Sequence, residues 1–284
     1  MKISNGKPPY SWKKLAKDEE PEAVAFLKAR EYSCVTACSR FITRTPYDRV
    51  WRVCNDTGNI AALLIYSHFT LFPVFGDTTP SPAPHFLSRF PQKLPPYAIQ
   101  GRKDDVELLE RFLKACGHTA REQNDYELMS LDTVPIFPKK RISGLTLRAP
   151  VPEDEDQLFE LHAAYEQEEV ISFHRDFNPA SCRLALRRIL ADQEVLTAEL
   201  DGRLVGKINT NARSFSRYQI GGVYVLPEYR NLGIGAAMTE ALAGSLIAEG
   251  KGVTLFVRTH NAAACRAYRN VGFASSAAYR IVYY

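Results

Sequence analysis

The sequence has little that would place the protein in a membrane, in an oxidising compartment or on nucleic acid. No apolar run approaches the length of a membrane span, and residues 1–18 lack the apolar core of a signal peptide. The six cysteines form no C-x-x-C pair and accompany no His-x-His cluster, which argues against a zinc site or a disulfide framework. The formal charge is only +4, and the basic residues form no stripe. We therefore expect a cytoplasmic protein that binds no metal, nucleic acid or membrane.

Apolar residues are plentiful, and they support packed cores along the whole chain. They make up 45% of 284 residues, enough for two domains of ordinary size. Residues 133–141 combine prolines with a basic run and show no periodicity, as is typical of a linker. We predict an N-terminal α/β domain over residues 1–132, a linker over 133–143 and a second domain over 144–284.

The N-terminal half alternates helical and strand patterns. The prolines between residues 76 and 96 predict a long surface loop, and Cys34 and Cys38, one helical turn apart, are expected to be ordinary packed thiols. The expected elements, in chain order, are helices over 21–30 and 34–42, strands over 50–54, 60–66, 69–75 and 97–100, a helix over 104–115 and a strand over 126–131.

The C-terminal half predicts a helix pair followed by antiparallel strands. An Asp201-Gly202 turn joins two strand patterns in a hairpin, and a polar loop is expected over 211–217. The expected elements are a strand over 145–149, helices over 155–166 and 181–191, and strands over 195–200, 203–209 and 219–225.

The stretch from Gln219 to Ile247 carries the functional argument. It predicts a strand, a sharp turn with Gly233 and Gly235, and an amphipathic helix. Unpaired N–H groups and the positive end of the helix dipole favour an anion such as a phosphate at such a helix start, and glycines allow close approach. The alternative is a β-to-α connection whose glycines serve only tight packing.

The residues of this turn resemble motif A of the GNAT N-acetyltransferase superfamily. Residues 230–235, RNLGIG, follow the pattern Arg/Gln-x-x-Gly-x-Gly/Ala. A second matching stretch follows in the family's order, with a strand over 253–257, then Asn261, then RAYRNVGF over 266–273. The resemblance covers about residues 145–284. In the N-terminal half it extends only to the order of elements, so that half is expected to be a divergent GNAT-like domain without a CoA motif.

The resemblance implies acetyl-CoA as co-substrate and assigns roles to individual residues. Backbone groups of Val223 and Val225 would contact the pantetheine, and Asn261 would contact the cofactor, although it also suits a helix N-cap. Tyr268 would be the catalytic acid for the leaving thiolate, the alternative being an aromatic residue that packs inward. The pyrophosphate would be wrapped by Arg230, Asn231, Leu232, Gly233, Ile234, Gly235 and Ala236.

The family's usual general base has no counterpart in this sequence. Where many relatives carry an acidic residue, this chain has Gly221, Gly222 and Val223, and the glycine pair leaves room for a bulky acceptor or for another backbone. His162, within a predicted helix, is expected to be structural. The remaining candidates for the base are Glu199, His174, or a water held by Gln219, Asn209 or Tyr224.

The sequence thus predicts an α+β protein with tandem GNAT-like domains, each a mixed, mostly antiparallel sheet flanked by helices. The expected function is acetyl transfer from acetyl-CoA to a primary amine of a small molecule or peptide, by a GNAT-type N-acetyltransferase. The missing acid leaves a second hypothesis, a non-catalytic acyl-CoA-binding regulatory module. A dinucleotide-binding oxidoreductase is disfavoured because Met238 occupies the third fingerprint position. A homodimer is left open.

Overall fold

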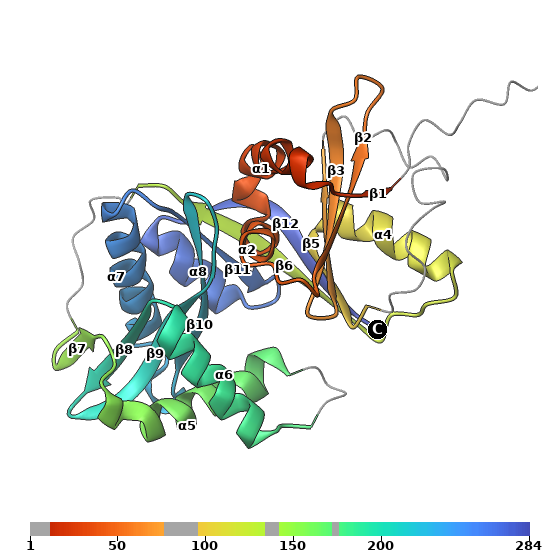
Figure 1. Ribbon diagram of the computed structural model, residues 1–284. Coiled ribbons are helices and arrows are strands. Elements are labelled where there is room, and N and C mark those ends of the chain that lie inside the picture. The colour runs from red at the N-terminus through yellow and green to blue at the C-terminus, as the bar shows by residue number, and fades with distance from the viewer. Residues whose placement is uncertain (1–11, 77–95, 134–141, 172–175) are drawn as a thin grey trace, which may run out of the picture. The chain divides into compact units, whose positions relative to one another are not determined.

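The chain forms two compact units, which are described separately (Figure 1). The computed structural model describes residues 12–76, 96–133, 142–171 and 176–284. Unit 1 comprises residues within Met1–Tyr126 and Ala277–Tyr284, and unit 2 comprises Glu127–Ser276. The division falls within two strands, and most of the expected linker at 133–143 lies outside the described residues.

Unit 1 is a mixed sheet with helices, and its elements follow the predicted order. Its strands are arranged β1-β2-β3-β4-β5-β12, antiparallel except for the parallel pair β4 and β5. The elements are β1 (Lys13–Lys14), α1 (Glu20–Lys28), α2 (Val35–Ile42), β2 (Arg49–Cys54), β3 (Ile60–Ser67), β4 (Thr70–Phe75), β5 (Ala98–Arg102), α4 (Lys103–Ala115), β6 (Glu122–Leu131) and β12 (Ala274–Tyr283).

The central strand β3 is buried on both faces because helices cover each side of the sheet. Ala62 and Leu64 join one apolar cluster with Leu109 of α4. The alternate residues Leu63 and Ile65 are equally buried, and α1 and α2 pack onto β3. This double burial explains why β3 is a continuous apolar run rather than an alternating one.

Strand β12 was not predicted, although most of it completes the sheet of unit 1. It pairs antiparallel with β5, from Tyr279 opposite Arg102 to Tyr283 opposite Ala98. Arg280, which is 8% exposed, donates to Asp125 Oδ1 at 2.6 Å and to Glu110 Oε2 at 3.2 Å. Charge-assisted bonds of this kind satisfy a buried guanidinium. A cut between residues 132 and 144 would remove this strand from unit 1.

Unit 2 has the element order of unit 1, with the helix α7 in addition between its two parallel strands; the segment between β4 and β5 lies largely outside the described residues. Its strands are arranged β6-β11-β10-β9-β8-β7, with β10 and β11 parallel. Strand β9 continues to Arg213 and β10 begins at Arg217, so the polar loop expected over 211–217 is shorter than predicted. The elements of this unit are β7 (Leu145–Arg148), α5 (Glu155–Tyr165), α6 (Pro179–Asp192), β8 (Val195–Leu200), β9 (Arg203–Arg213), β10 (Arg217–Val225), α7 (Ile234–Ala248), β11 (Gly252–Arg258) and α8 (Ala262–Val271).

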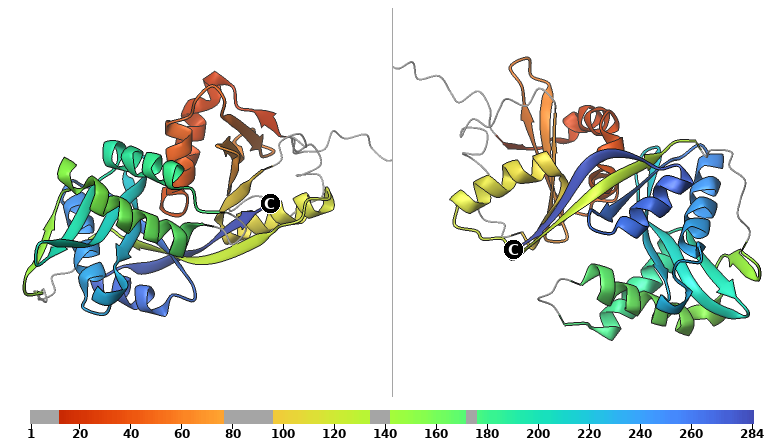
Figure 2. Two further views of the ribbon diagram at one scale, coloured as in Figure 1. Left: turned by 90° about the horizontal axis from the view of Figure 1, so that it is seen from below. Right: turned by 180° about the vertical axis from the view of Figure 1, so that it is seen from behind.

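The two faces of the unit 2 sheet carry different helices (Figures 1 and 2). Met238 and Leu242 of α7 pack with Val205 and Ile220 in the larger core, which α8 also joins. On the opposite face, α5 and α6 form a smaller cluster that includes Leu161, Leu186, Leu204 and Tyr224. The neighbours Leu204 and Val205 thus point to opposite faces, as a strand requires.

Leu242→Ala should destabilise the protein by about 2–5 kcal/mol, the usual cost of removing a buried leucine from a packed core. Leu242 is 3% exposed within the α7 cluster. The matched control is Leu184→Ala on α6, where the leucine is 51% exposed and the change should stay within about 0.5 kcal/mol. Urea unfolding of the full chain measures both variants, and equal effects would contradict this placement of the core.

Candidate functional site

The parallel ladder between β10 and β11 ends early and leaves a strand edge open. Its residue pairs run from Arg217 opposite Gly252 to Ile220 opposite Leu255. Beyond that point β10 pairs only with β9, through Gly221, Tyr224 and Val225, with a register shift between Gly221 and Tyr224. Among the described residues, the edge that carries Val223 and Val225 has no partner strand on the β11 side. Apart from Val225 O, which accepts from Arg230 Nε, its backbone groups are therefore available to a ligand.

The loop after this strand presents a run of free donors to the same end of the sheet. Among the described residues, no acceptor takes the backbone N–H groups of residues 231–236, and the first N–H of the helix that bonds back is that of Ala237, to Gly233 O at 3.0 Å. Asn231 has φ +64° and Gly233 has φ +88°, both in the left-handed region. Consecutive N–H groups in such a turn form an anion-binding concavity, which the positive end of α7 strengthens.

Gly235 is not explained by packing within the protein. A Cβ built at this position would meet only Val225 Cγ2, at 3.8 Å, which is ordinary contact. Gly233, by contrast, is needed for its left-handed backbone. Space for a ligand to approach is therefore left at Gly235, next to the N–H groups of the loop.

Arg230 is placed differently from the rest of the loop. Its guanidinium donates from Nε to Val225 O at 3.0 Å and from Nη2 to Glu168 Oε2 at 2.7 Å, and its own backbone N–H bonds to Pro227 O. This pairing holds the pKa of Glu168 below its usual range. Arg230 therefore joins the loop to the segment after α5, and its N–H group is not one of the free donors.

Tyr268 lies on α8 with its hydroxyl free of any hydrogen bond to the described residues. Its ring packs edge-on against Phe273, with centroids 6.2 Å apart. Burial raises the pKa of Tyr268 above its ordinary value, and the charges of Tyr165 and Glu169 act in the same direction. The phenol is therefore protonated at neutral pH and can donate a proton or a hydrogen bond.

Asn261 caps the helix that carries Tyr268. Its side-chain oxygen accepts from Ala264 N at 3.1 Å, the standard N-cap arrangement. The cap fixes the start of α8 at the end of β11. Asn261 thus has a structural role in any case, and its amide nitrogen makes no hydrogen bond to a described residue.

The structure limits the predicted candidates for the general base. Glu199 lies on β8, two strands away from β10, in an ion pair with Arg148 at 2.8 Å. Gln219 donates to Asn211 Oδ1 at 2.9 Å. His162 is 1% exposed, and burial next to Lys207 lowers its pKa to about 3, as expected of a structural histidine. His174 falls outside the described residues.

Glu169, which was not among the predicted site residues, is a carboxylate whose charge contributes to the raised pKa of Tyr268. It lies in the one-turn π-helix Glu166–Val170 that follows α5 and is partly buried. Burial raises the pKa of Glu169 above its ordinary value, and Arg258 of β11 partly opposes this from 3.8 Å. The sequence shows acidic residues at Glu166, Glu168 and Glu169. It does not show that they lie opposite β11 and α8, because that depends on how α5 packs.

The glycine pair of β10 makes room for side chains of β9. A Cβ at Gly222 would come within 2.1 Å of Asn209 Oδ1, and one at Gly221 within 2.3 Å of Asn211 Nδ2. Lys207 Nζ donates to Asn209 Oδ1 and to Gly222 O, each at 3.1 Å. Lys207 is 1% exposed, and burial lowers its pKa to about 7. The pair thus accommodates a buried polar group that fixes the irregular part of the strand.

The unpaired N–H groups of the loop and the open edge of β10 both lie within the part of the chain that matches a known family. Residues 155–273 match the acetyltransferase (GNAT) family model. This part of the chain is a GNAT-type N-acetyltransferase domain. Members of the family transfer an acyl group from acyl-CoA. No curated protein matches the chain.

Solved structures extend the fold similarity to the N-terminal half. A Drosophila protein is 14% identical and aligns over 96% of this chain and 98% of its own, with a TM-score of 0.66. A GCN5-related N-acetyltransferase from Sphaerobacter thermophilus is 18% identical over 96% and 95%, with a TM-score of 0.58. A tandem GNAT protein from the clavulanic acid biosynthesis pathway is 13% identical over 96% and 97%, at 0.54. At these identities the comparisons show the fold, which is that of tandem GNAT-like domains.

Within residues 12–76, 96–133, 142–171 and 176–284, no group of three or more His, Cys, Asp or Glu side chains is placed to hold a metal ion. No helix in these ranges is long and apolar enough to span a membrane.

Gly235→Glu should abolish the binding of acetyl-CoA to the full chain, because a carboxylate would occupy the space in front of the free N–H groups. Titration calorimetry measures the change. Ser245→Glu, on an exposed position of the same helix, adds the same charge away from the loop and should bind as the unmodified protein does. Unchanged binding by Gly235→Glu would show that the loop does not hold the cofactor.

Proposed function

We propose that this protein transfers the acetyl group of acetyl-CoA to a primary amine of a small molecule or peptide. The observation that carries the proposal is the run of unpaired N–H groups over residues 231–236, at the end of a strand whose ladder to β11 has stopped. A diphosphate suits the loop, and an extended amide-bearing chain suits the open strand edge. Coenzyme A contains both parts in this order.

The residues of unit 2 divide the work of binding the donor. The N–H groups of residues 231–236 bind the pyrophosphate, and Gly235 leaves it room. Val223 and Val225 bind the pantetheine arm through their backbone groups other than Val225 O, which accepts from Arg230. Arg230 keeps Glu168 against the loop and adds a positive charge at its edge. Asn261 orients the start of α8 and has a free amide to offer the cofactor.

Acetyl transfer to an amine requires an acceptor for the amine proton and a donor for the leaving sulfur. Bound acetyl-CoA supplies an activated acyl group on sulfur. Glu169 is the base that we assign: its raised pKa brings a carboxylate closer to the range useful for proton transfer. Tyr268 is the acid that we assign, because its hydroxyl is protonated and unpaired.

The acidic segment after α5 also suits a cationic acceptor. One turn contains three acidic residues, Glu166, Glu168 and Glu169. Arg230 pairs with Glu168 at 2.7 Å, whereas Arg258 lies farther from Glu169, at 3.8 Å. An ammonium group is attracted to such a segment before it loses its proton. This charge supports an amine acceptor over an anionic one.

A non-catalytic acyl-CoA-binding module is the second candidate. It is favoured by Gly221 and Gly222, which stand where many relatives carry an acidic residue, and which here accommodate Asn211 and Asn209. The two functions differ in turnover. The full chain, incubated with acetyl-CoA and pools of primary amines, should release free thiol continuously if it is an enzyme. Binding without thiol release on any pool would favour the module.

We further propose that unit 1 binds no CoA. In this unit the ladder between β4 and β5 ends at Leu71 opposite Ile99, much as in unit 2. Here, however, the buried Asp105 of α4 accepts from Phe75 N at 3.3 Å and from Arg102 at 3.1 Å. A side chain of the protein thus occupies the opening, and its negative charge opposes a phosphate. The long surface loop predicted between residues 76 and 96 lies almost wholly outside the described residues.

Tyr268→Phe should lower kcat by about 10²–10⁴-fold, the usual contribution of a general acid, and leave acetyl-CoA affinity nearly unchanged. Steady-state kinetics and calorimetry separate the two effects. Tyr218→Phe on β10 is the control. The Tyr218 ring packs against the larger core, with the Arg213 guanidinium carbon 5.3 Å from its centre, so this substitution should not affect turnover. Full activity in Tyr268→Phe would make this residue a packing group.

Glu169→Gln should remove the acidic limb of the pH profile of kcat/KM. With the unmodified protein, activity should be lost as pH falls through the pKa of Glu169, above the ordinary 4.5, because the protonated carboxyl accepts no proton. Glu160→Gln, at an exposed position of α5, is the matched control and should keep the limb. If Glu169→Gln retains the same profile, the base lies elsewhere.

A further inference from the structure

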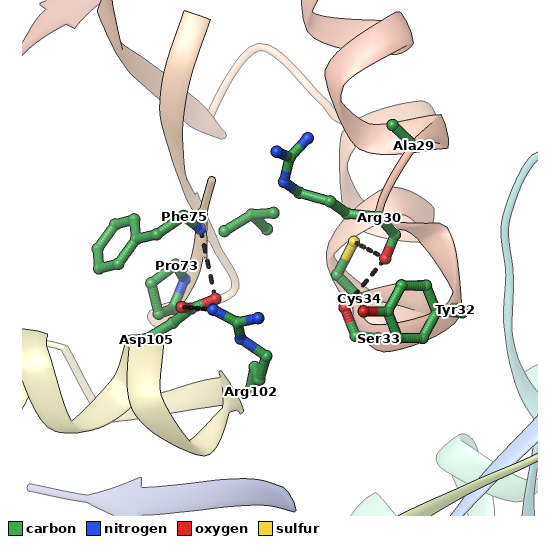
Figure 3. Close-up of a pocket in the computed structure, with 10 residues that line it drawn as sticks. Ala29, Arg30, Tyr32, Ser33, Cys34, Pro73, Phe75, Arg102 and Asp105 are labelled. Atoms are coloured by element: carbon green, nitrogen blue, oxygen red, sulfur yellow. Dashed lines mark hydrogen bonds and ion pairs between the residues drawn. The ribbon is translucent and has the colours of Figure 1, made fainter. Parts of the chain in front are cut away.

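Unit 1 contains a cavity of about 270 Å³ next to the opening between β4 and β5 (Figure 3). Arg30, Ser33 and Cys34, from the turn between α1 and α2, line one side. Phe75, Arg102 and Asp105 line the other. The volume is below the range of about 300–1,000 Å³ that is usual for drug-sized ligands, so the cavity suits a smaller molecule.

The cavity carries one positive charge that no carboxylate of the described residues balances. Arg102 is paired with Asp105 at 3.1 Å. Arg30 faces them from the helical side, where its Nη1 donates only to Phe26 O at 3.3 Å and its guanidinium lies 4.2 Å from the centre of the Phe26 ring. Its Nε is buried without a hydrogen-bond partner, and no carboxylate of the described residues pairs with it.

Arg44 also lies over a phenylalanine ring, but its guanidinium charge is balanced by a carboxylate. Its guanidinium lies 4.3 Å from the centre of the Phe41 ring and it donates to Phe41 O, as Arg30 does with Phe26. Arg44, however, also forms an ion pair with Glu20 at 2.5 Å. A partly buried guanidinium is costly without a counter-ion, and none of the described carboxylates reaches Arg30, which points to an anionic ligand.

We propose that this cavity binds a small monocarboxylate. A carboxylate is planar and matches the two-pronged donor geometry of Arg30. A single negative charge balances the single excess positive charge of the cavity. Inorganic phosphate has a greater charge at neutral pH, and the carboxylate of Asp105 across the cavity would oppose it. This site is separate in the chain from the loop 231–236 and does not depend on the proposed enzymatic function.

Calorimetric titration of the full chain with pyruvate tests the proposal. Pyruvate should bind, and Arg30→Met should weaken its affinity by about tenfold or more, as expected for the loss of a charge-assisted bond. Arg44→Met removes a stacked arginine outside the cavity and should leave pyruvate affinity unchanged. Acetyl-CoA affinity should be the same in all three proteins, which distinguishes this site from the site in unit 2.

The proposal is overturned if pyruvate, lactate and acetate all fail to bind, or if Arg30→Met binds pyruvate as well as the unmodified chain does. Tighter binding of inorganic phosphate than of pyruvate would also overturn it. Circular dichroism checks the folding of each variant. Should Arg30→Met not fold, Arg30→Lys retains the charge without the planar fork and should still weaken pyruvate binding severalfold, whereas unchanged affinity would contradict the proposal.

Discussion

The end of the β10–β11 ladder at Ile220 is the constraint on which the rest of the site depends. A parallel pair that continued to Val225 would use the strand edge for the sheet itself. Because the pairing stops, β10 offers its backbone to a ligand, and the loop that follows it starts α7 with unpaired N–H groups. Lys207 contributes from the neighbouring strand by holding Gly222 O in the irregular segment. Binding capacity thus comes mainly from backbone geometry.

The two side chains that we propose as catalytic groups belong to different elements around this strand and loop. Tyr268 is positioned by α8, whose start is fixed by the Asn261 cap, and Glu169 by the turn that follows α5. Neither helix is adjacent to the other in sequence. Arg258 of β11 links the two regions, since it donates to Glu169 O at 3.0 Å and ends the strand that leads into α8. The site therefore requires the packing of both sheet faces.

Much of this could be predicted from local sequence. Strand patterns, the Asp201-Gly202 hairpin and the glycine-bearing turn are local signals, and the elements lie where those signals indicated. The family resemblance then supplied the roles of Tyr268 and the loop. Strand β12 was missed because its N-terminal part, Ala274–Ala278, is small and polar and has little strand character. Glu169 was missed because its raised pKa arises from burial in the folded protein. Arg30 was missed because the sequence does not show which carboxylates lie near it in the fold.

The two units differ in what occupies the end of their parallel strand pair, and we propose that only unit 2 is open to a cofactor. Both contain a parallel pair that stops early, followed by a helix. In unit 2 the helix α7, between the two strands, starts with N–H groups that have no partner among the described residues. In unit 1 the buried Asp105 of α4, the helix that follows the second strand, takes the Phe75 N–H group. One buried carboxylate is enough to change which ligands such an opening favours.

The most direct test of this account is amide NMR of the isotope-labelled full chain titrated with coenzyme A. The account predicts that the largest shifts occur at the N–H groups of residues 231–236, with smaller shifts along Gly221–Val225. The N–H groups of residues 101–106 in unit 1 should stay in place. Coenzyme A binding that leaves residues 231–236 unmoved, or that shifts residues 101–106 instead, would contradict the account.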